Sequence, residues 1–439
     1  MKAPAKALSL FDSTCIIVGI IIGAGIYETT PTVAACMGGW GGTMAVWLAG
    51  GLLALCGALC YAELATAYPR QGGDVVYLSR AYGSWAGFMF GWSQMAIIRP
   101  GDIALMAFVF ARYAATLYSP FPAMGTAYAA GAVVALTLVN MVGVRAGRIA
   151  QNILTVVKLA GLLFIVAVGF LAPGADAAPV GAAFSSDGFK LAMILVLFTY
   201  GGWNEMAYVA AEIKDPQRNI VRALVLGTVA VAATYLLANA AFLHALGFQG
   251  MAASGAVAVD AVAMLMPGGA ERLVAVLICI SALGAVNGLV FTGARISYAM
   301  GTGHRVFNWL GAWHPSLGTP VAALALQGVL ALAIVLLAGS FIETILYSAP
   351  AVWLFFLATG LALFRLRRKD AQVQRPFKVV AYPVVPLLFC GAALFMFYSS
   401  VSYAVAGKPI GLLLLLGIVA AGGGLCWRNS KNGPPPESD

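Results

Sequence analysis

Long apolar segments separated by short polar ones follow one another along almost the whole chain. A helix that crosses a membrane needs about 20 mostly apolar residues. By this criterion the pattern predicts twelve membrane-spanning helices, at residues 9–37, 41–67, 80–116, 125–142, 148–172, 188–212, 218–246, 271–300, 318–338, 341–364, 381–403 and 410–427. The expected fold class is therefore an all-α integral membrane protein, with one polytopic membrane domain over residues 1–428.

The two ends of the chain are polar. The first six residues lead into the first helix without a clear cleavage site, so we expect them to be retained rather than removed as a signal peptide. The last residues, 429–439, are polar and rich in proline, and they predict a short disordered tail.

Two of the predicted helices contain glycine-rich interruptions, IIIGAGIY at 20–27 and FTYGGWNE at 198–205. Inside a bilayer, free backbone N–H and C=O groups need partners, so a helix is broken there only where these groups face protein, water or a bound solute. Matched breaks in two halves of a chain are typical of secondary transporters that bind their solute near mid-membrane. The sequence therefore predicts a substrate site where the two breaks meet.

The chemistry of the breaks indicates what that substrate is. The half-helix that follows Gly23 to Gly25 presents free N–H groups and the positive end of its dipole, which suit a carboxylate. The half-helix that ends near Phe198 to Gly201 presents free carbonyl groups, which suit an ammonium. Together they predict an α-amino acid zwitterion. The aromatic residues of the second break either cover that solute or serve only in packing.

Composition agrees with a membrane protein. The chain is 62% hydrophobic and 9% charged, with a mean hydropathy of +0.92, against roughly 25% charged residues in soluble domains. Most lysines and arginines lie in segments expected on the inner side, so the net charge of +9 follows from the positive-inside bias and requires no nucleic acid. This bias predicts cytoplasmic termini.

Catalytic and metal-binding patterns are not found in the sequence. Its three histidines and seven cysteines show no metal-ligand spacing, and the odd number of cysteines argues against a disulfide framework. A catalytic triad and a cofactor motif are also lacking. We therefore expect no metal, no cofactor and no enzymatic activity.

Charged residues inside predicted spans are candidates for function, because they are costly in a membrane. Lys158 lies roughly 10 Å deep in its helix, where it either snorkels to the inner surface or forms an internal cation that bridges the broken helices. The second alternative is favoured. Arg99 and Asp102 are three residues apart and share a helix face if the kink at Pro100 permits, so they can pair with each other. Such a pair would be either structural or a part of the pocket or its gate. Glu205 either forms a structural hydrogen bond or contacts the substrate or a proton, and Glu63 is expected to have a structural or gate-latching role.

A family resemblance rests on six motifs: IVGIIIGAGI at 17–26, CYAEL at 60–64, GGD at 72–74, IIRP at 97–100, YGGWN at 200–204 and RPFK at 375–378. These motifs resemble the amino acid-polyamine-organocation superfamily, and most closely its L-type amino acid transporter branch, over nearly the whole chain. The resemblance implies a LeuT-type fold of two inverted five-helix repeats, 9–172 and 188–364, whose helices 1 and 6 are unwound at mid-membrane. Helices 11 and 12, at 381–427, would lie outside the repeats.

The resemblance also implies roles for single residues. Backbone amides at the first break would bind the substrate carboxylate, and carbonyls near Ile21, Phe198 and Gly201 would take the amine. Phe198 matches an extracellular gating aromatic, and Lys158, with Ser281 in the eighth helix, matches the lysine that replaces a sodium ion. The implied substrate-binding residues are Ile21, Gly23, Ala24, Gly25, Ile97, Ile98, Phe198, Gly201, Gly202, Trp203, Asn204, Glu205 and Trp353.

Three residues depart from the pattern of the branch. Ala24 stands where a serine is common, so a hydroxyl contact to the carboxylate is missing. Gly201 stands where relatives with cationic substrates can carry an aspartate, so this route to basic side chains is closed. Glu205 stands where aromatic or amide residues are common, and it would restore some preference for cations or introduce a proton step.

The expected function is sodium-independent transport, by exchange and alternating access, of small or medium neutral L-amino acids across an inner or plasma membrane. The alternative is a proton-coupled importer of amino acids or amines with the same fold, in which Glu205, Glu63 or Asp102 carries the proton. A receptor that binds amino acids without transporting them is disfavoured because no long soluble extension is present.

Eukaryotic members of the branch link to a heavy subunit through a cysteine after the third helix. Residues 117–124 contain no cysteine, so no obligatory heavy subunit is expected.

Overall fold

The computed structural model describes residues 5–121, 124–175, 185–337, 341–407 and 409–431. Helices make up most of this part of the chain. Their bounds are α1 (Leu10–Ile21), α2 (Gly25–Met37), α3 (Trp40–Ala67), α4 (Asp74–Tyr82), α5 (Ser84–Ser93), the π-helical η1 (Gln94–Ile98), α6 (Arg99–Leu117), α7 (Met124–Val142), α8 (Val144–Leu171), α9 (Ser186–Thr199), the 3₁₀-helical η2 (Trp203–Glu212), α10 (Pro216–Ala253), α11 (Val257–Ala263), α12 (Ala270–Gly303), the 3₁₀-helical η3 (Arg305–Gly311), α13 (Val321–Leu337), α14 (Phe341–Lys369), α15 (Val384–Gly407) and α16 (Pro409–Lys431).

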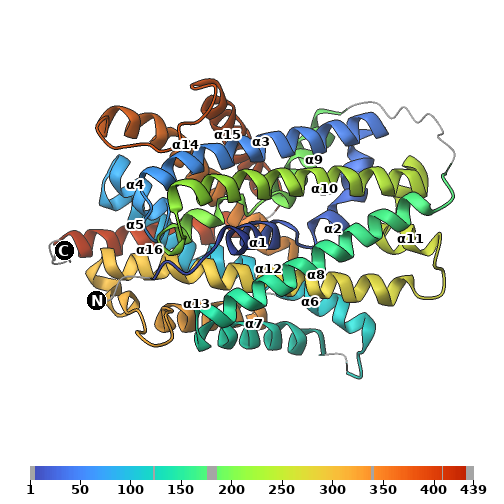
Figure 1. The fold of residues 1–439 in the computed structure, drawn as a ribbon, viewed down its shortest axis with the longest axis horizontal. Coiled ribbons are helices and arrows are strands. Elements are labelled where there is room, and N and C mark those ends of the chain that lie inside the picture. The colour runs from blue at the N-terminus through green and yellow to red at the C-terminus, as the bar shows by residue number, and fades with distance from the viewer. Residues whose placement is uncertain (1–4, 122–123, 176–184, 338–340, 408, 432–439) are drawn as a thin grey trace.

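Most long helices run along the longest axis of the molecule, and the two chain termini lie at the same end (Figure 1). We call this end the termini side. The short helix α1 lies inside the bundle, where it packs against α8, α10 and α12. Near its start, the Leu8 N–H donates to the carbonyl of Glu212, and the Lys214 N–H donates back to the carbonyl of Leu8, each at 2.9 Å. These bonds fix the start of the chain to the end of η2.

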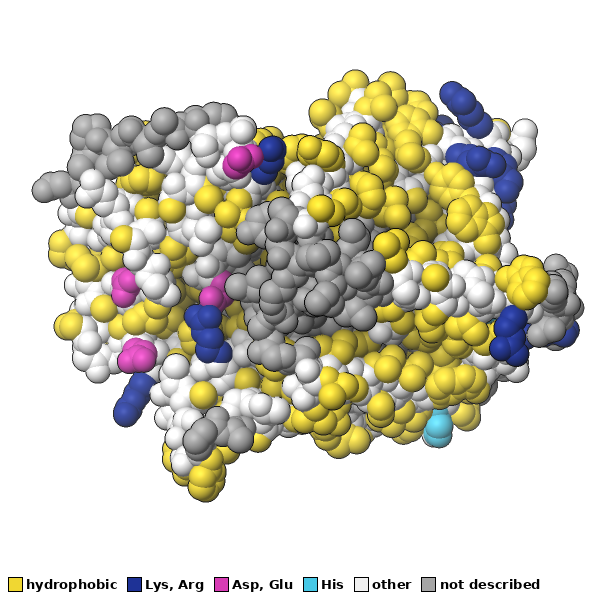
Figure 2. All heavy atoms as spheres, turned by 180° about the vertical axis from the view of Figure 1, so that it is seen from behind, with side chains coloured by type: hydrophobic (Ala, Val, Ile, Leu, Met, Phe, Trp, Pro, Cys, Tyr) yellow, Lys and Arg dark blue, Asp and Glu magenta, His cyan; other side chains and the backbone are white. Residues whose placement is uncertain are grey.

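Eight helices in the described residues are long and apolar enough to cross a membrane, and the bent pair of α1 and α2 would be a ninth. The axes of this pair differ by 46°. Hydrophobic side chains dominate the face drawn in Figure 2, and charged side chains lie towards its two ends. The prediction of a multi-pass membrane protein is confirmed, whereas twelve spans and the LeuT-type repeats stay predictions.

Some helix boundaries differ from the predicted ones. The third predicted helix, at 80–116, starts inside α4, which is a separate short helix ended by Gly83 with a φ of 105°. A non-glycine residue rarely adopts such a positive φ, so this glycine separates α4 from the long helix that begins at Ser84. Apolar periodicity does not reveal a turn of this kind, because glycine is also common inside membrane helices.

The predicted tail and leader lie largely outside the described residues. Helix α16 continues through Lys431, and residues 432–439 are not described. The same holds for residues 1–4 at the other end. The first helix itself starts at a well-formed cap, in which Ser9 and Asp12 satisfy each other's backbone N–H groups.

The two helix breaks contact each other. The chain leaves α9 at Thr199 and passes through Gly202, whose φ is 111°. A Cβ atom at Gly202 would lie 2.7 Å from Cγ2 of Ile20 in α1. Both the backbone conformation and the close approach of α1 therefore require glycine here, and this contact brings the two breaks to one place in the fold.

Candidate functional site

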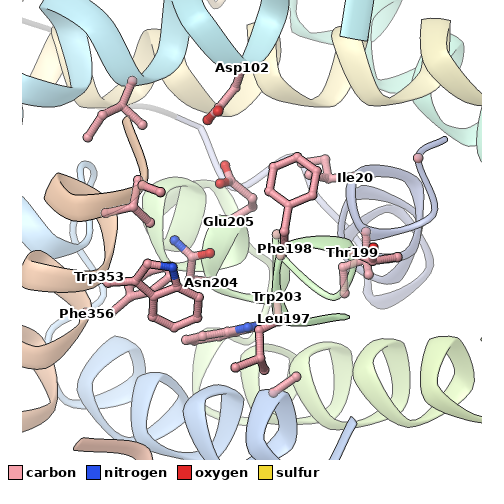
Figure 3. A pocket seen from close by; sticks show the side chains of 18 of the residues that line it. Ile20, Asp102, Leu197, Phe198, Thr199, Trp203, Asn204, Glu205, Trp353 and Phe356 are labelled. Atoms are coloured by element: carbon pink, nitrogen blue, oxygen red, sulfur yellow. The ribbon is translucent and has the colours of Figure 1, made fainter. Parts of the chain in front are cut away.

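A cavity of about 180 Å³ lies between the two breaks. Figure 3 shows the side chains of Phe198, Asn204, Glu205 and Trp353 around it, on three different segments of chain. Among the site residues expected from the sequence, those that line the cavity are Ile21, Gly23, Gly25, Ile98, Phe198, Gly201, Gly202, Trp203, Asn204, Glu205 and Trp353. Ala24 does not line it, and Ile97 packs beside Ile98 and Ala351 instead.

The backbone at the first break is partly satisfied within the protein. The N–H of Gly23 donates to the carbonyl of Ile21 at 2.7 Å, and the hydroxyl of Tyr235 donates to the same carbonyl at 2.8 Å. A carbonyl oxygen has two lone pairs, so that of Ile21 is already fully used. The first residues of α2, Gly25 and Ile26, have no helical acceptors for their N–H groups, because they begin the helix.

At the second break, backbone carbonyls end helix α9. The carbonyl of Phe198 accepts from the N–H of Gly201 at 2.9 Å, and the N–H of Tyr200 is also directed at it. The last carbonyls of a helix otherwise have no helical donor. Donors at the start of α2 and an acceptor at the end of α9 thus border the same cavity, an arrangement that suits a solute with one anionic and one cationic group.

Lys158 lies inside the protein behind the first break, with 1% of its surface exposed. Its ammonium donates to the carbonyls of Gly19 at 2.7 Å, Ile22 at 2.9 Å and Ser281 at 2.7 Å. The Ser281 hydroxyl lies 3.0 Å from the Ile22 carbonyl and 3.2 Å from that of Gly23. Lys158 therefore does not snorkel to the inner surface. It lies inside the protein, where its ammonium joins α8 to the end of α1 and to α12.

Arg99 does not pair with Asp102, so the expected pairing was wrong. Its Nη2 contacts Glu205 Oε1 at 2.6 Å, and its Nε donates to Gln94 Oε1 at 3.0 Å. The second oxygen of Glu205 accepts from Thr292 at 2.6 Å. Spacing within one helix shows which residues share a face, but it does not show that a carboxylate from η2 reaches α6 and takes the arginine.

Asp102 lines the same cavity and is half-buried. Figure 3 shows its carboxylate projecting from α6 on the side where Glu205 lies. Within the part of the chain that the structure describes, it has neither a hydrogen-bond donor nor an ion-pair partner. It differs in this from Glu205, whose two oxygens are both occupied.

Aromatic side chains form another wall of the cavity. The Trp203 ring lies 5.3 Å from that of Phe356 and 5.6 Å from that of Phe389, centroid to centroid, and Trp353 lies 5.5 Å from Phe356. Neither phenylalanine was predicted from the sequence. Phe356 follows Trp353 by one helical turn, a spacing that pointed to it. Phe389 comes from α15, outside the implied repeats, and carried no such signal.

A hydrogen-bonded chain leads from the cavity towards the termini side. Asn204 donates to the hydroxyl of Tyr208 at 2.7 Å, and this hydroxyl donates to Asp74 at 3.0 Å. Asp74 also accepts from Tyr61 at 2.7 Å and from Thr359 at 2.5 Å. This fully buried carboxylate in α4 therefore joins α3, η2 and α14. Burial raises its pKa to about 6, in spite of the three hydroxyl donors.

Two further buried carboxylates join helices near the same end. Glu212 at the end of η2 pairs with Arg295 of α12 at 2.8 and 3.1 Å. Glu63 of α3 pairs with Arg367 of α14 at 2.8 and 2.5 Å and accepts from the N–H of Val379 at 2.7 Å. With Asp74, these carboxylates tie together the helices that surround the path from the cavity to the termini side.

Comparisons with known proteins identify the family of the chain. A family model described as amino acid permease matches residues 8–421. The b(0,+)-type amino acid transporter 1 of Mus musculus is 32% identical over 409 residues, which cover 90% of this chain and 82% of that protein. The serine/threonine exchanger SteT of Bacillus subtilis is 29% identical over 417 residues, or 94% of each chain.

A third relative corrects one expectation. The large neutral amino acids transporter small subunit 2 of Oryctolagus cuniculus is 32% identical over 445 residues, which cover 97% of this chain and 81% of that protein. A protein similar over almost the whole of this chain is thus by name a small subunit. This finding contradicts the expectation, drawn from residues 117–124, that no heavy subunit is needed.

The family and its members are transporters, so the expectation that this chain is no enzyme is confirmed. The similarities extend over most of each relative, and the matched region contains both helix breaks and the cavity between them. The chain therefore belongs to the amino acid permease family of the amino acid-polyamine-organocation superfamily, and its resemblance to the L-type branch is confirmed.

Proposed function

We propose that this chain exchanges small or medium neutral L-amino acids across a plasma or inner membrane, independently of sodium, by alternating access. The observation that carries the proposal is the position of Lys158. Its ammonium fills a cage of three carbonyls at the end of α1. A fixed charge in that cage leaves no room for a dissolved cation, so transport driven by such an ion is not expected.

The ligand would lie across the cavity between the breaks. The N–H groups that begin α2, at Gly25 and Ile26, would hold the carboxylate at the positive end of that helix. The carbonyls of Phe198 and Gly201, where α9 ends, would hold the amine. The remaining walls are largely apolar and aromatic, which supports a preference for apolar side chains.

Alternating access would depend on movement of the same elements. We propose that the half-helices α1 and η2 move with the LeuT-type repeats 9–172 and 188–364, and that Phe198 covers the substrate on the outer side. The buried carboxylates Glu63, Asp74 and Glu212 would then hold the termini side closed. The excess of basic residues in the loops near the termini supports a cytoplasmic position for both termini.

The experiment uses the full-length protein in liposomes. Uptake of labelled leucine is measured with and without internal unlabelled leucine, and with and without sodium and proton gradients. We expect uptake that needs internal amino acid and ignores both gradients. Uptake into empty liposomes that depends on a sodium gradient would disprove the proposal, and uptake driven by a proton gradient would replace exchange with symport.

A further inference from the structure

The wall of the cavity formed by α6 and η2 carries three charged side chains: Arg99, Glu205 and Asp102. Arg99 and Glu205 form an ion pair in which each side chain is 4% exposed, so they neutralise each other. Asp102 remains. Arg99 of its own helix and Glu205 of η2 are the charged described residues that line the cavity with it, and the pair they form has no net charge.

An unpaired carboxylate inside a membrane protein is costly, and such groups face a substrate or ion path as a rule. Lys158 cannot compensate Asp102, because its three donors are used by carbonyls behind α1. Glu205 cannot serve a ligand in place of Asp102, since Arg99 and Thr292 occupy its oxygens. Arg99 lies near enough to act on Asp102 electrostatically, but it is paired with Glu205 and forms no ion pair with Asp102. A cation that enters the cavity would therefore be a direct partner for this carboxylate.

The shape of the surroundings indicates the kind of cation. Apolar side chains line the cavity near Asp102, among them Ile98, Leu105, Met106 and Leu289. An amino acid held at the two breaks directs its side chain away from them. A side chain that passes apolar walls and ends at a carboxylate fits best when it has an aliphatic stem and a charged end.

We propose that Asp102 forms a subsite for the cationic end of a substrate side chain, so that this carrier accepts amino acids with a terminal ammonium or guanidinium group as well as neutral ones. The proposal rests on the proposed function for the position of the zwitterion. It differs from the route through Gly201 considered in the sequence, because the carboxylate comes from α6 instead of from the second break.

The test compares lysine with norleucine, which has the same carbon chain without the ammonium. Each is used to inhibit uptake of labelled leucine by proteoliposomes with the wild type, Asp102→Asn and Asp187→Asn. Asp187 is a matched control, because its side chain is 89% exposed and does not line the cavity. In Asp102→Asn we expect the lysine concentration for half inhibition to rise about tenfold or more, with norleucine nearly unchanged.

Several outcomes would overturn the subsite. One is wild-type leucine uptake that lysine does not inhibit, and another is an equal loss of lysine and norleucine inhibition in Asp102→Asn. A third is a variant that loses only a dependence on the proton gradient, which would make Asp102 a proton site instead.

A binding measurement separates this proposal from the proposed function. Lysine should raise the thermal unfolding temperature of the purified wild type more than that of Asp102→Asn, whether or not the protein transports leucine. Failure of leucine uptake alone would therefore disprove the exchange mechanism but leave the subsite supported by binding. An equal shift in both proteins would disprove the subsite.

Discussion

A single ammonium holds the end of α1 to two other helices. Replacing Lys158 with alanine leaves the carbonyls of Gly19, Ile22 and Ser281 without their donor in a membrane interior. We expect leucine flux to fall at least about tenfold while the amount of protein in the membrane falls much less. Flux per reconstituted molecule is the measurement. Normal flux in Lys158→Ala at normal abundance would remove the main support for the proposed mechanism.

The two carboxylates on the cavity wall formed by α6 and η2 should respond differently to the same chemical change. Glu205→Gln leaves Arg99 buried without its counter-charge, and breaking a buried pair costs about 3–5 kcal/mol in the free energy of unfolding. Asp102→Asn breaks no pair and should not lower stability. Chemical unfolding in detergent measures both. Equal losses in the two variants would mean that Asp102 has a structural partner after all.

Phe198 covers one side of the cavity and is only partly buried. Truncation in Phe198→Ala should impair translocation more than stability, because the side chain contributes little to the core but would close the outer side over the substrate. Exchange rate and substrate affinity, measured separately in liposomes, test this. Unchanged kinetics would argue against a gating role.

At the scale of single residues, the sequence pointed to Lys158, Glu205 and Arg99 because charges are rare in the apolar segments. It did not reveal their partners. Arg99 was assigned to the acid on its own helix, since spacing along one helix is the relation that a sequence displays directly. The actual partner is more than a hundred positions away and depends on how η2 packs against α6.

Among elements, the two breaks and their glycines were evident in the sequence, because GAG and YGG interrupt apolar runs. The 3₁₀ conformation of η2 and the close approach of Ile20 to Gly202 were not, since both depend on packing between helices. For the same reason Phe389, from a helix outside the implied repeats, was missed as a wall of the cavity.

The contact between the breaks can be tested with one methyl group. At Gly202 a Cβ would lie 2.7 Å from Ile20, on a backbone with φ of 111°. Gly202→Ala should cost about 1–3 kcal/mol in the free energy of unfolding and reduce transport strongly. Gly41→Ala is the matched control: its Cβ meets nothing within 4 Å in α3, so the change should be neutral or slightly stabilising. Equal effects would show that the breaks do not pack as described.

Over the whole molecule, the buried carboxylates gather on one side of the cavity. Glu63, Asp74 and Glu212 join helices on the path to the termini side. A transporter that exposes its site to that side must separate these groups from their donors. In the proposed mechanism this side is the closed one, and its opening would require several buried hydrogen bonds to be exchanged for water.

This closure should depend on pH through Asp74. Its pKa is raised to about 6 by burial, whereas a hydrated aspartate has a pKa near 3.9. The closed state therefore binds the proton more tightly, so a fall in pH from 7 to 5 on the termini side should favour it and slow exchange. Exchange rates at each pH test this prediction. Asp74→Asn should lose this dependence.

A control for that experiment lies in the same region. The pKa of Asp370 is lowered, because hydrogen bonds from Arg80 and Tyr68 outweigh the effect of burial. Asp370→Asn should therefore keep the change in exchange rate between pH 7 and 5. Loss of the dependence in this variant, or its survival in Asp74→Asn, would show that another group titrates.

The π-helical segment η1 holds more residues per turn than the α-helices on either side of it, and the N–H of Arg99, the residue that follows it, donates to the carbonyl of Gln94. Successive residues of a helix are turned by about 100° relative to each other. If one residue of η1, such as Ala96, were deleted, the helix would still be long enough to cross the bilayer, but Asp102 would point elsewhere. The range of substrates thus depends on the number of residues in η1 as well as on their identity. A deletion too small to alter the fold would be enough to remove the carboxylate of Asp102 from the cavity and, with it, the preference for a cationic side chain.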